Sequence, residues 1–494
     1  MTANYPSMIL NKSEGASESE RYLIRKCQST FLSLWSYPNP FTTEKKGKEL
    51  CDVLAVFENH IFILSDKFCS FRNEGDIRIA WNRWYRHAVE AGAKQILGAE
   101  RYIRANGQIF LDVKLTQPFP LPITINKDTC IHRIIVARGV REACIRYFDG
   151  GTGSLLVNTG IVGHQHLYDI DRVGTPIGSK KDPLFSIGIV SSRQSYIHVF
   201  DDYTLDCVMD ELDTVSDFIN YLEQKEQLIL SGKDFIADGE EEILGRYVGT
   251  TENGMHCIVK KSEAREYQCF HFSDFWLRYC QNPDRLVKIK ENRSSYLWDA
   301  LLEKAFRSMM DGTLRDMSHQ DYKLQALLFY RFAKPCRVER RALANSFKES
   351  YASALREIGL RNSVINTFVR RMSLDSIKDT LITILWLYCP AEESIDNILL
   401  LRKKFLEAKV LSILPSARKY TYHIGIAKTL DIERENSEDF IYINANDFSD
   451  DCIEVQEAIA FLASQSELLG RQAYNVYSEE YSDKTDIADM PYPW

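Results

Sequence analysis

The chain has 494 residues and a formal net charge of −8, with 45% hydrophobic and 26% charged residues, which is an ordinary globular composition. The acidic balance excludes a protein that binds nucleic acid through an overall positive charge, so any basic surface must be local. No apolar run reaches the ~20 residues that span a bilayer. The start of the chain is polar, unlike a signal peptide, and the 12 cysteines form no C-x-x-C pair. We therefore expect a cytoplasmic protein with reduced thiols and no membrane partner.

The first two hundred residues mix strands with a few long helices. Helical spacing of apolar residues predicts a helix over 18–36, which ends at the prolines of 37–41. Two β-rich runs at 52–57 and 60–65 are separated by two residues, which predicts a hairpin. A long helical pattern covers 77–104. Further strands are expected at 108–115, 131–138, 142–148, 185–190 and 195–200.

After a helical segment at 203–231, the predicted secondary structure becomes mainly helical and then returns to alternating strands and helices. A polar, acidic break at 233–242 predicts a domain boundary, and 243–372 is mainly helical apart from an expected hairpin around 254–272. A strand, helix, strand and helix follow at 379–389, 393–411, 421–429 and 451–469. The predicted divisions are a flexible tail at 1–18, an α/β domain at 19–232, a helical domain at 243–372, a smaller α/β domain at 379–478 and an acidic tail at 479–494. The predicted fold class is mixed α/β.

Acidic residues and a lysine stand at the ends of the two hairpin strands. Glu49 and Asp52 precede or open the first strand, and Asp66 and Lys67 close the second. Such charges are costly beside buried strands unless they are paired or bind a cation. An antiparallel hairpin places the start of one strand beside the end of its partner, so we expect these side chains at one edge of a sheet. Carboxylates suit Mg²⁺, which also takes phosphate oxygens, and a neighbouring lysine stabilises an anionic phosphorus centre.

This order resembles the PD-(D/E)XK, or restriction-endonuclease-like, nuclease superfamily. In that family a helix contributes a Glu, the first strand an Asp, and the next strand an acid, a spacer and a Lys. Glu49, Asp52 and Lys67 match, and Gln95 on the sheet-facing stripe of 77–104 resembles the helix behind the site. The resemblance implies a nuclease that uses Mg²⁺ or Mn²⁺. It implies metal ligands among Glu49, Asp52 and Asp66, and catalytic roles for these three together with Lys67 and Gln95.

The chain departs from the family pattern at Ser65, which stands where the acid two residues before the lysine is expected. In a regular strand Asp66 points away from Lys67. A bulge would bring both to the site. Otherwise Ser65 replaces the acid and the metal depends on Glu49 and Asp52, or the site is inactive. The whole chain also resembles uncharacterised bacterial proteins linked to phage defence, which implies an antiviral effector. The alternative is a non-catalytic sensor or scaffold with a degenerate nuclease-like domain.

Basic residues form a second stripe along 77–104. Arg83, Lys94 and Arg101 belong to it, and such a stripe either follows a phosphate backbone or is the solvated face of an amphipathic helix. Trp81 and Trp84 are expected in the core. DNA or RNA as the substrate, a partner protein and a homo-oligomer all remain open.

Three other patterns are weaker. The pair His164 and His166, before Asp169 and Asp171, has the residue types of a metal site, but a short His-x-His is common and we favour no ligand role. Four further candidates have a spacing unlike zinc knuckles and are expected to be buried: His256, Cys257, Cys269 and His271. The glycine-rich stretches 150–154 and 174–181 lack the phosphate-loop order and predict turns, with a small-molecule enzyme as the third alternative.

Overall fold

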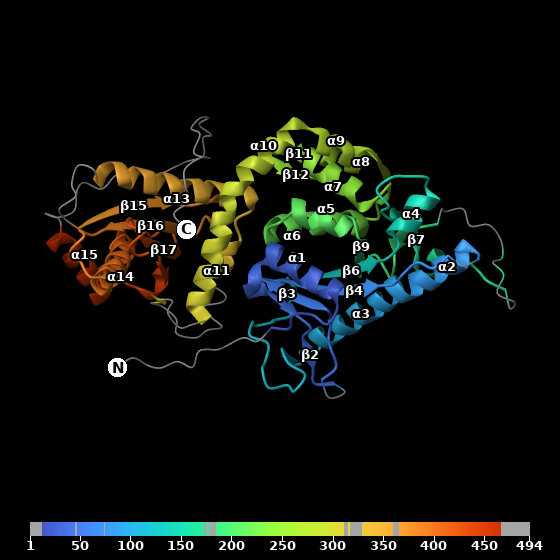
Figure 1. Cartoon of the computed structure of the whole chain (residues 1–494), viewed down its shortest axis with the longest axis horizontal. Helices are drawn as coiled ribbons and strands as arrows, with labels where there is room; N and C mark the ends of the chain where they lie inside the picture. Colours follow the sequence, from blue (N-terminus) through green and yellow to red (C-terminus); the bar gives the residue numbers. More distant parts are fainter. Residues whose placement is uncertain are drawn as a thin grey trace. The chain divides into compact units, whose positions relative to one another are not determined.

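The computed structural model describes residues 12–44, 47–73, 75–171, 175, 177, 184–310, 315–316, 329–358 and 365–465 (Figure 1). These residues form two compact units, 12–289 and 290–465. Helices and strands are interspersed along the chain, so the predicted mixed α/β class is confirmed. The predicted tail at 479–494, and most of the one at 1–18, lie outside the described residues. No described helix combines the length and the apolar character that crossing a bilayer requires.

A five-stranded mixed sheet organises the unit 12–289. Its strands in spatial order are β1 (Ser36–Pro38), β3 (Val53–Phe57), β4 (His60–Phe68), β6 (Cys130–Arg138) and β9 (Ile197–Phe200). The pairs β1–β3 and β3–β4 are antiparallel, whereas β4–β6 and β6–β9 are parallel. Phe57 pairs with His60, and Glu58 takes a positive φ of 52°, as a two-residue hairpin turn requires. The predicted β3–β4 hairpin is therefore confirmed.

Helices cover both faces of this sheet (Figure 1). The helices α1 (Glu18–Trp35) and α6 (Val215–Leu230) share one face, where the rings of Phe31, Phe62 and Phe218 meet with centroids 4.7–6.0 Å apart. The opposite face carries α3 (Ala91–Arg104). Burying apolar surface on both faces stabilises the sheet, at roughly 25 cal/mol for each Å² removed from water.

The long helix predicted at 77–104 is interrupted by a π turn. It consists of α2 (Ile77–Tyr85), the π-helical turn η2 (Arg86–Glu90) and α3. A π turn shifts the helical phase, so the buried residues of α3 include Gly92, Ile96 and Ile103 but not Gln95. Gln95 is only half-buried as a result. Trp81 and Trp84 precede the turn and are buried as predicted.

The acidic break at 233–242 does not separate the two units, because it contains a strand. The strand β10 (Asp234–Ala237) is part of a second sheet, between β13 (Cys269–Phe272) on one side and β7 (Leu156–Val162) with β8 (Ser186–Ile189) on the other. The unit therefore extends to residue 289. The polar composition of the segment misled the prediction, since Phe235 and Ala237 are the only apolar residues that β10 buries.

Other predicted elements of this unit differ in type. The expected strand at 142–148 is the helix α4 (Arg141–Tyr147), and the expected hairpin around 254–272 is absent because β13 pairs in parallel with β10. The expected helix at 203–231 divides where Thr214 caps the N-terminus of α6. The remaining elements of the unit are β2 (Phe41–Thr42), β5 (Ile109–Phe110), η3 (Gly163–His166), α5 (Thr204–Glu211), α7 (Glu240–Gly249), β11 (Thr251–Glu252), β12 (Met255–His256), α8 (Lys261–Glu266), α9 (Phe275–Gln281) and α10 (Pro283–Asn292).

The unit 290–465 holds its own five-stranded sheet. The strand order is β14 (Arg315–Asp316), β18 (Glu438–Asn444), β17 (Tyr422–Thr429), β16 (Thr380–Tyr388) and β15 (Asn366–Met372). The helix α13 (Arg337–Ile358) packs against β15 and β16, α14 (Ile395–Leu411) packs on β17 and β18, and α15 (Ile453–Ser464) packs on α14 (Figure 1). The helix α11 (Tyr296–Met310) packs on α13.

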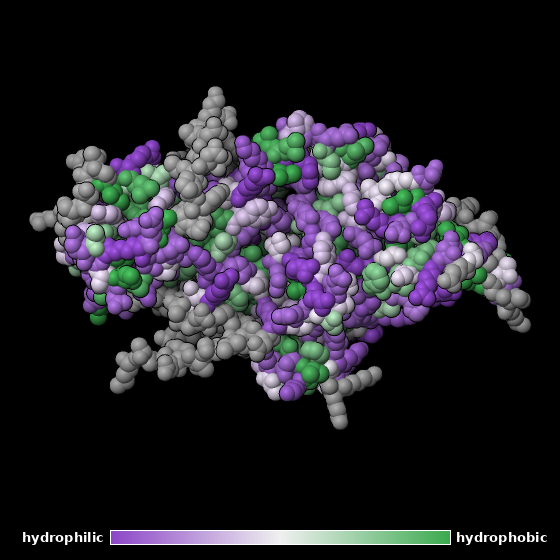
Figure 2. Space-filling view, viewed as in Figure 1, coloured by the Kyte–Doolittle hydropathy of each residue, from purple (hydrophilic) through white to green (hydrophobic). Residues whose placement is uncertain are grey.

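Hydrophilic side chains cover most of the face shown in Figure 2, with apolar groups in small separate patches. The strands β16 and β17 are almost fully buried. In each unit most of the buried apolar residues lie in the layers between the helices and the sheet.

Candidate functional site

Asp52 and Lys67 meet at one end of the β3–β4 hairpin. The amide of Asp52 donates to the carbonyl of Leu64 at 3.1 Å, which places Asp52 directly before β3 and beside the end of β4. Oδ2 of Asp52 accepts from the backbone amide of Asp66 and lies 3.3 Å from Nζ of Lys67. Asp52 is 7% exposed, whereas the Lys67 side chain is 27% exposed. The pair is therefore anchored in the sheet and open to solvent on the lysine side.

Glu49 lies beside Asp52 and carries an unusual pKa. Its Oε1 accepts from the Asn39 amide at 3.2 Å, and its backbone bridges to Phe41. Burial and the negative charge of Asp52 together raise the pKa of Glu49 to about 7. Burial and the charge of Asp52 thus disfavour the ionised form of Glu49, and a bound cation would favour it.

Ser65 and Asp66 lie on opposite faces of β4. Pairing between β4 and β6 is unbroken from His60↔Cys130 to Phe68↔Arg138, so no bulge realigns this strand end. Oγ of Ser65 donates to Oε1 of Gln95 at 2.8 Å, on the α3 face. The carboxylate of Asp66 lies on the other face, where it accepts from Nε of Arg138 at 2.7 Å. The structure therefore brings Glu49, Asp52 and Lys67 together, with Gln95 linked through Ser65, and does not bring the side chain of Asp66 to them.

A cleft of about 330 Å³ opens beside these residues, between the β2 region and α3. Its walls include Glu49, Gln95, Lys94 and Arg101, all predicted from the sequence for catalysis or nucleic-acid binding. Arg83 is exposed on α2 and does not line this cleft. Lys94 is 75% exposed and pairs with Glu90 at 3.2 Å. Two of the three predicted basic residues therefore line the same cleft as the carboxylate of Glu49.

Sequence reasoning missed two contributors to this site. Lys48 lines the cleft, and Asn39 holds the Glu49 carboxylate. Lys48 could have been found from its place next to Glu49. Asn39 could not, because its 37-YPNPF-41 setting reads as a helix stop.

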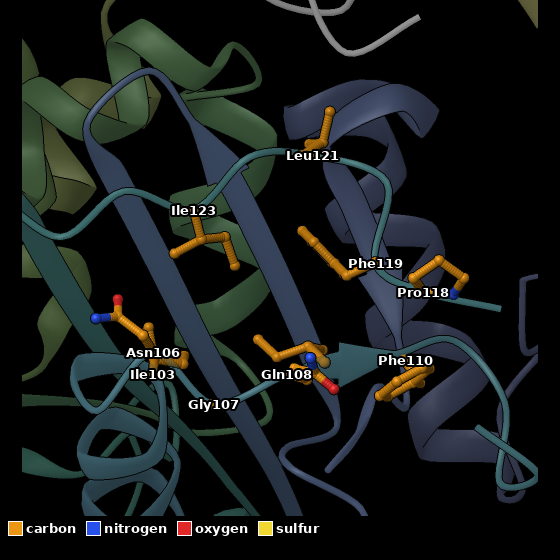
Figure 3. Close-up of a pocket in the computed structure, with 10 residues that line it drawn as sticks. Ile103, Asn106, Gly107, Gln108, Phe110, Pro118, Phe119, Leu121 and Ile123 are labelled. Atoms are coloured by element: carbon orange, nitrogen blue, oxygen red, sulfur yellow. The ribbon is translucent and has the colours of Figure 1, made fainter. Parts of the chain in front are cut away.

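A second cleft of about 340 Å³ lies near the C-terminal end of α3 (Figure 3). Its lining is mostly apolar, and none of the ten residues is an acid or a base: Ile103, Asn106, Gly107, Gln108, Ile109, Phe110, Pro118, Phe119, Leu121 and Ile123. Such a lining offers no group for proton transfer or metal binding, so this cleft is not a catalytic candidate.

The weaker sequence candidates have structural roles where they are described. His166 is buried, with Nδ1 at 2.7 Å from the Gly163 carbonyl and Nε2 accepting from the Gly188 amide at 2.9 Å. Both ring nitrogens are thus used, in agreement with no ligand role. Of the four residues expected to be buried, only Cys257 is; His256, Cys269 and His271 are exposed because the predicted hairpin is absent.

The glycine-rich stretch 150–154 follows α4 with positive φ at Gly150, Gly151 and Gly153, in agreement with the predicted turn. In 150–154, Thr152 and Ser154 both donate to the carboxylate of Glu241 at 2.6–2.7 Å. Burial and Asp201 raise the pKa of Glu241 to about 7. Most of 174–181 lies outside the described residues.

Glu49 and Asp52 have the donor chemistry for Mg²⁺ or Mn²⁺. Hard divalent cations take carboxylate oxygens and usually keep several waters, so that one or two protein carboxylates suffice for Mg²⁺. A bound cation would offset the burial and the negative charge of Asp52 that raise the pKa of Glu49. The third carboxylate of the expected set is missing, since Ser65 holds that position and Asp66 is bound to Arg138.

Comparisons with known proteins provide no relative for this chain. No protein-family model matches it, and no curated protein or solved structure is significantly similar to it. The resemblance to PD-(D/E)XK nucleases therefore stays a prediction, and the case for a functional site rests on the geometry of Glu49, Asp52, Lys67 and Gln95.

Proposed function

We propose that the unit 12–289 is a metal-dependent nuclease that cleaves the phosphodiester backbone of DNA or RNA. The observation that carries this proposal is the pairing of Asp52 with Lys67 beside Glu49, because Glu49 in turn lines a cleft that Lys94 and Arg101 also line. Carboxylates for a metal, a lysine for the reacting phosphate and basic residues for neighbouring phosphates are the groups that this chemistry requires.

Each side chain has a separate role in this proposal. Glu49 and Asp52 would hold Mg²⁺ or Mn²⁺, which when bound supplies an activated water and neutralises phosphate charge. Lys67, partly exposed, donates to the non-bridging oxygens as charge develops on them. Gln95 is held through its amide oxygen by Ser65, which leaves its amide nitrogen to donate to substrate.

The basic residues of the cleft would hold the rest of the strand. Lys48, Lys94 and Arg101 line the same cleft as Glu49. Contacts of this kind are not sequence-specific and weaken as salt concentration rises. The overall charge of −8 makes such a local basic surface necessary for any nucleic-acid ligand.

A second candidate function is binding of nucleic acid without cleavage, as a sensor or scaffold. The observation that favours it is the loss of the third carboxylate, with Ser65 bonded to Gln95 and Asp66 bound by Arg138. The cleft and its basic wall would remain useful for binding. A role in antiviral defence is compatible with either function and stays a prediction.

A cleavage assay on the full chain separates these functions. Plasmid, single-stranded DNA and single-stranded RNA are incubated with Mg²⁺, with Mn²⁺ or with a chelator. Asp52→Asn and Lys67→Met should each lower the cleavage rate by at least about 10²-fold. The matched controls Glu142→Gln and Lys114→Met, at exposed positions of the same unit, should cut like the parent.

The outcomes of the assay are distinct. Cleavage that survives the chelator, or equal cleavage by parent and both site variants, contradicts the nuclease proposal. Salt-sensitive binding that Lys94→Ala and Arg101→Ala weaken, with no cleavage under any metal, favours the sensor or scaffold. A chain that neither binds nor cuts excludes both.

A further inference from the structure

A second cluster of metal-ligating side chains lies at the opposite end of β4 from Lys67. His60 opens β4 and Cys130 opens β6, and the two are paired in register. Glu223 reaches them from α6, which packs on this face of the sheet. One ligand atom from each of His60, Cys130 and Glu223 lies within 4.8 Å of the other two. Three elements that are distant in the sequence thus present nitrogen, sulfur and oxygen donors at one point.

A layer of buried polar groups stands directly behind this cluster. Nε2 of His132 lies 3.0 Å from Nδ1 of His60, and Nδ1 of His132 lies 2.9 Å from Oε1 of Glu226. The same Glu226 oxygen is 3.0 Å from Nε2 of His198. His132 and His198 are fully buried. Chains of carboxylate and imidazole groups of this kind commonly orient the ligands of a metal and set their tautomers.

We propose that His60, Cys130 and Glu223 bind a zinc ion. Imidazole nitrogen, thiolate sulfur and carboxylate oxygen are the ligands that zinc takes in proteins, and three protein ligands leave one position for water or a substrate group. The thiolate excludes Mg²⁺, which requires oxygen donors, so this site and the one at Glu49 and Asp52 select different metals. The inference stands independently of the proposed nuclease activity.

Accessibility and placement indicate what the ion does. The side chains of His60 and Glu223 are 12% and 33% exposed, so an ion can enter from solvent without unfolding the sheet. Once bound, it joins the starts of β4 and β6 to α6. Because the unfolded chain lacks this arrangement, zinc binding should stabilise the fold, by an amount that grows with the logarithm of the zinc concentration relative to Kd.

Short-range sequence patterns do not predict this site. His60 and the stretch 130-CIH-132 each stand at the start of a strand, but the spacings from 60 to 130 and from 130 to 223 match no short metal motif. Only the parallel pairing of β4 with β6 brings the first two ligands together.

Zinc binding by the purified full chain tests the proposal. The protein is stripped with a chelator and titrated with Zn²⁺ against a chromophoric competitor, and in parallel with Co²⁺, whose complexes with thiolates show a charge-transfer absorption band. We expect one ion per chain bound with these ligands, a rise in Tm with zinc, and the thiolate band with cobalt.

Variants assign the ligands. Cys130→Ser should abolish the cobalt band, and Glu223→Gln, on a partly exposed helix face, should weaken zinc binding with little effect on folding. Glu226→Gln should weaken zinc binding by about 10- to 100-fold, because His132 would lose the carboxylate that orients its ring. The controls are Cys269→Ser and His164→Ala, an exposed cysteine and an exposed histidine of the same unit, which should bind like the parent. The assignment would be overturned if the parent bound no zinc, or if Cys130→Ser and Glu223→Gln bound zinc as tightly as the parent. The histidines would then form a purely hydrogen-bonded cluster.

Discussion

Asp52 and Lys67 are fifteen positions apart in the sequence, yet Oδ2 of Asp52 lies 3.3 Å from Nζ of Lys67. The two-residue turn of the β3–β4 hairpin is the reason, because it returns the end of β4 to the start of β3. The backbone amide of Asp66 donates to the same carboxylate, whereas the side chain of Asp66 lies on the opposite face of β4. Neighbouring residues of one strand end thus belong to two different networks, and variants should separate them.

Asp66→Asn should cost stability and leave metal binding intact. The Asp66 carboxylate and the Arg138 guanidinium are both buried, and removing one partner of a buried ion pair typically costs about 3–5 kcal/mol. Urea unfolding of the variant measures this loss. Titration with Mg²⁺ should give the parent's affinity for Asp66→Asn and a much weaker one for Asp52→Asn. Normal stability with lost Mg²⁺ binding in Asp66→Asn would instead place its carboxylate in the site.

Ser65→Asp should strengthen Mg²⁺ binding. The side chain at 65 lies on the same strand face as Lys67, beside Gln95, so an aspartate there supplies the missing third carboxylate. We expect at least ten-fold tighter binding, about 1.4 kcal/mol, together with lower stability in the absence of metal because Ser65 is fully buried. The measurement is Tm with and without Mg²⁺.

Ser65→Asn is the matched control for this substitution, since it has the same size without the charge. Its Tm should respond to Mg²⁺ as the parent's does. An equal response of the aspartate and asparagine variants would show that position 65 does not face the metal.

Lys225→Met should destabilise the unit 12–289 more than the double variant Lys225→Met, Glu240→Gln. The two side chains form an ion pair with 1% and 2% exposure, and Tyr221 donates to the other oxygen of Glu240 at 2.6 Å. Removing the lysine alone leaves a buried carboxylate uncompensated, at a cost of about 3–5 kcal/mol. Neutralising both partners removes that penalty and keeps an acceptor for Tyr221. Additive losses in a double-mutant cycle, measured by urea unfolding, would contradict this coupling.

Lys409→Met should stabilise the unit 290–465 at neutral pH. Burial, and after it the charge of Arg371, lowers the pKa of Lys409 to about 8 from its usual 10.5. Keeping Lys409 charged in the folded state at pH 7 therefore costs on the order of 3 kcal/mol. Methionine has no charge, so the substitution removes this cost.

The pH dependence of this effect has a definite sign. Between pH 8 and 10.5 the unfolded state holds the Lys409 proton that the folded state has released, so the stability of the parent rises with pH across this window. The advantage of Lys409→Met should shrink over the same range. Thermal unfolding at pH 7, 9 and 10.5 measures it, with the exposed Lys404→Met of the same helix as the control. An advantage that does not change with pH would show that Lys409 does not titrate in this range.

Local patterns in the sequence determined the elements on which the candidate site stands. Two continuous apolar runs and a two-residue turn define the β3–β4 hairpin, and a hairpin of that length must bring Asp52 and Lys67 together. The burial of Trp81 and Trp84 likewise follows from helical spacing within a few residues. Such features are decided by backbone geometry and by apolar periodicity over one or two turns or strands.

Only the tertiary structure decided which face each charged residue uses and which distant residue it meets. Asp66 is held by Arg138, 72 positions away, because β6 pairs in parallel with β4 through a long crossover. The π turn at Arg86–Glu90 moved Gln95 to the margin of the buried stripe, and the pairing of β10 with β7 and β13 made a strand of a segment whose composition indicated a linker. The physical reason is common to all three. Long-range pairing is chosen by the total free energy of burying apolar surface and satisfying backbone hydrogen bonds, and no short stretch of sequence contains that sum.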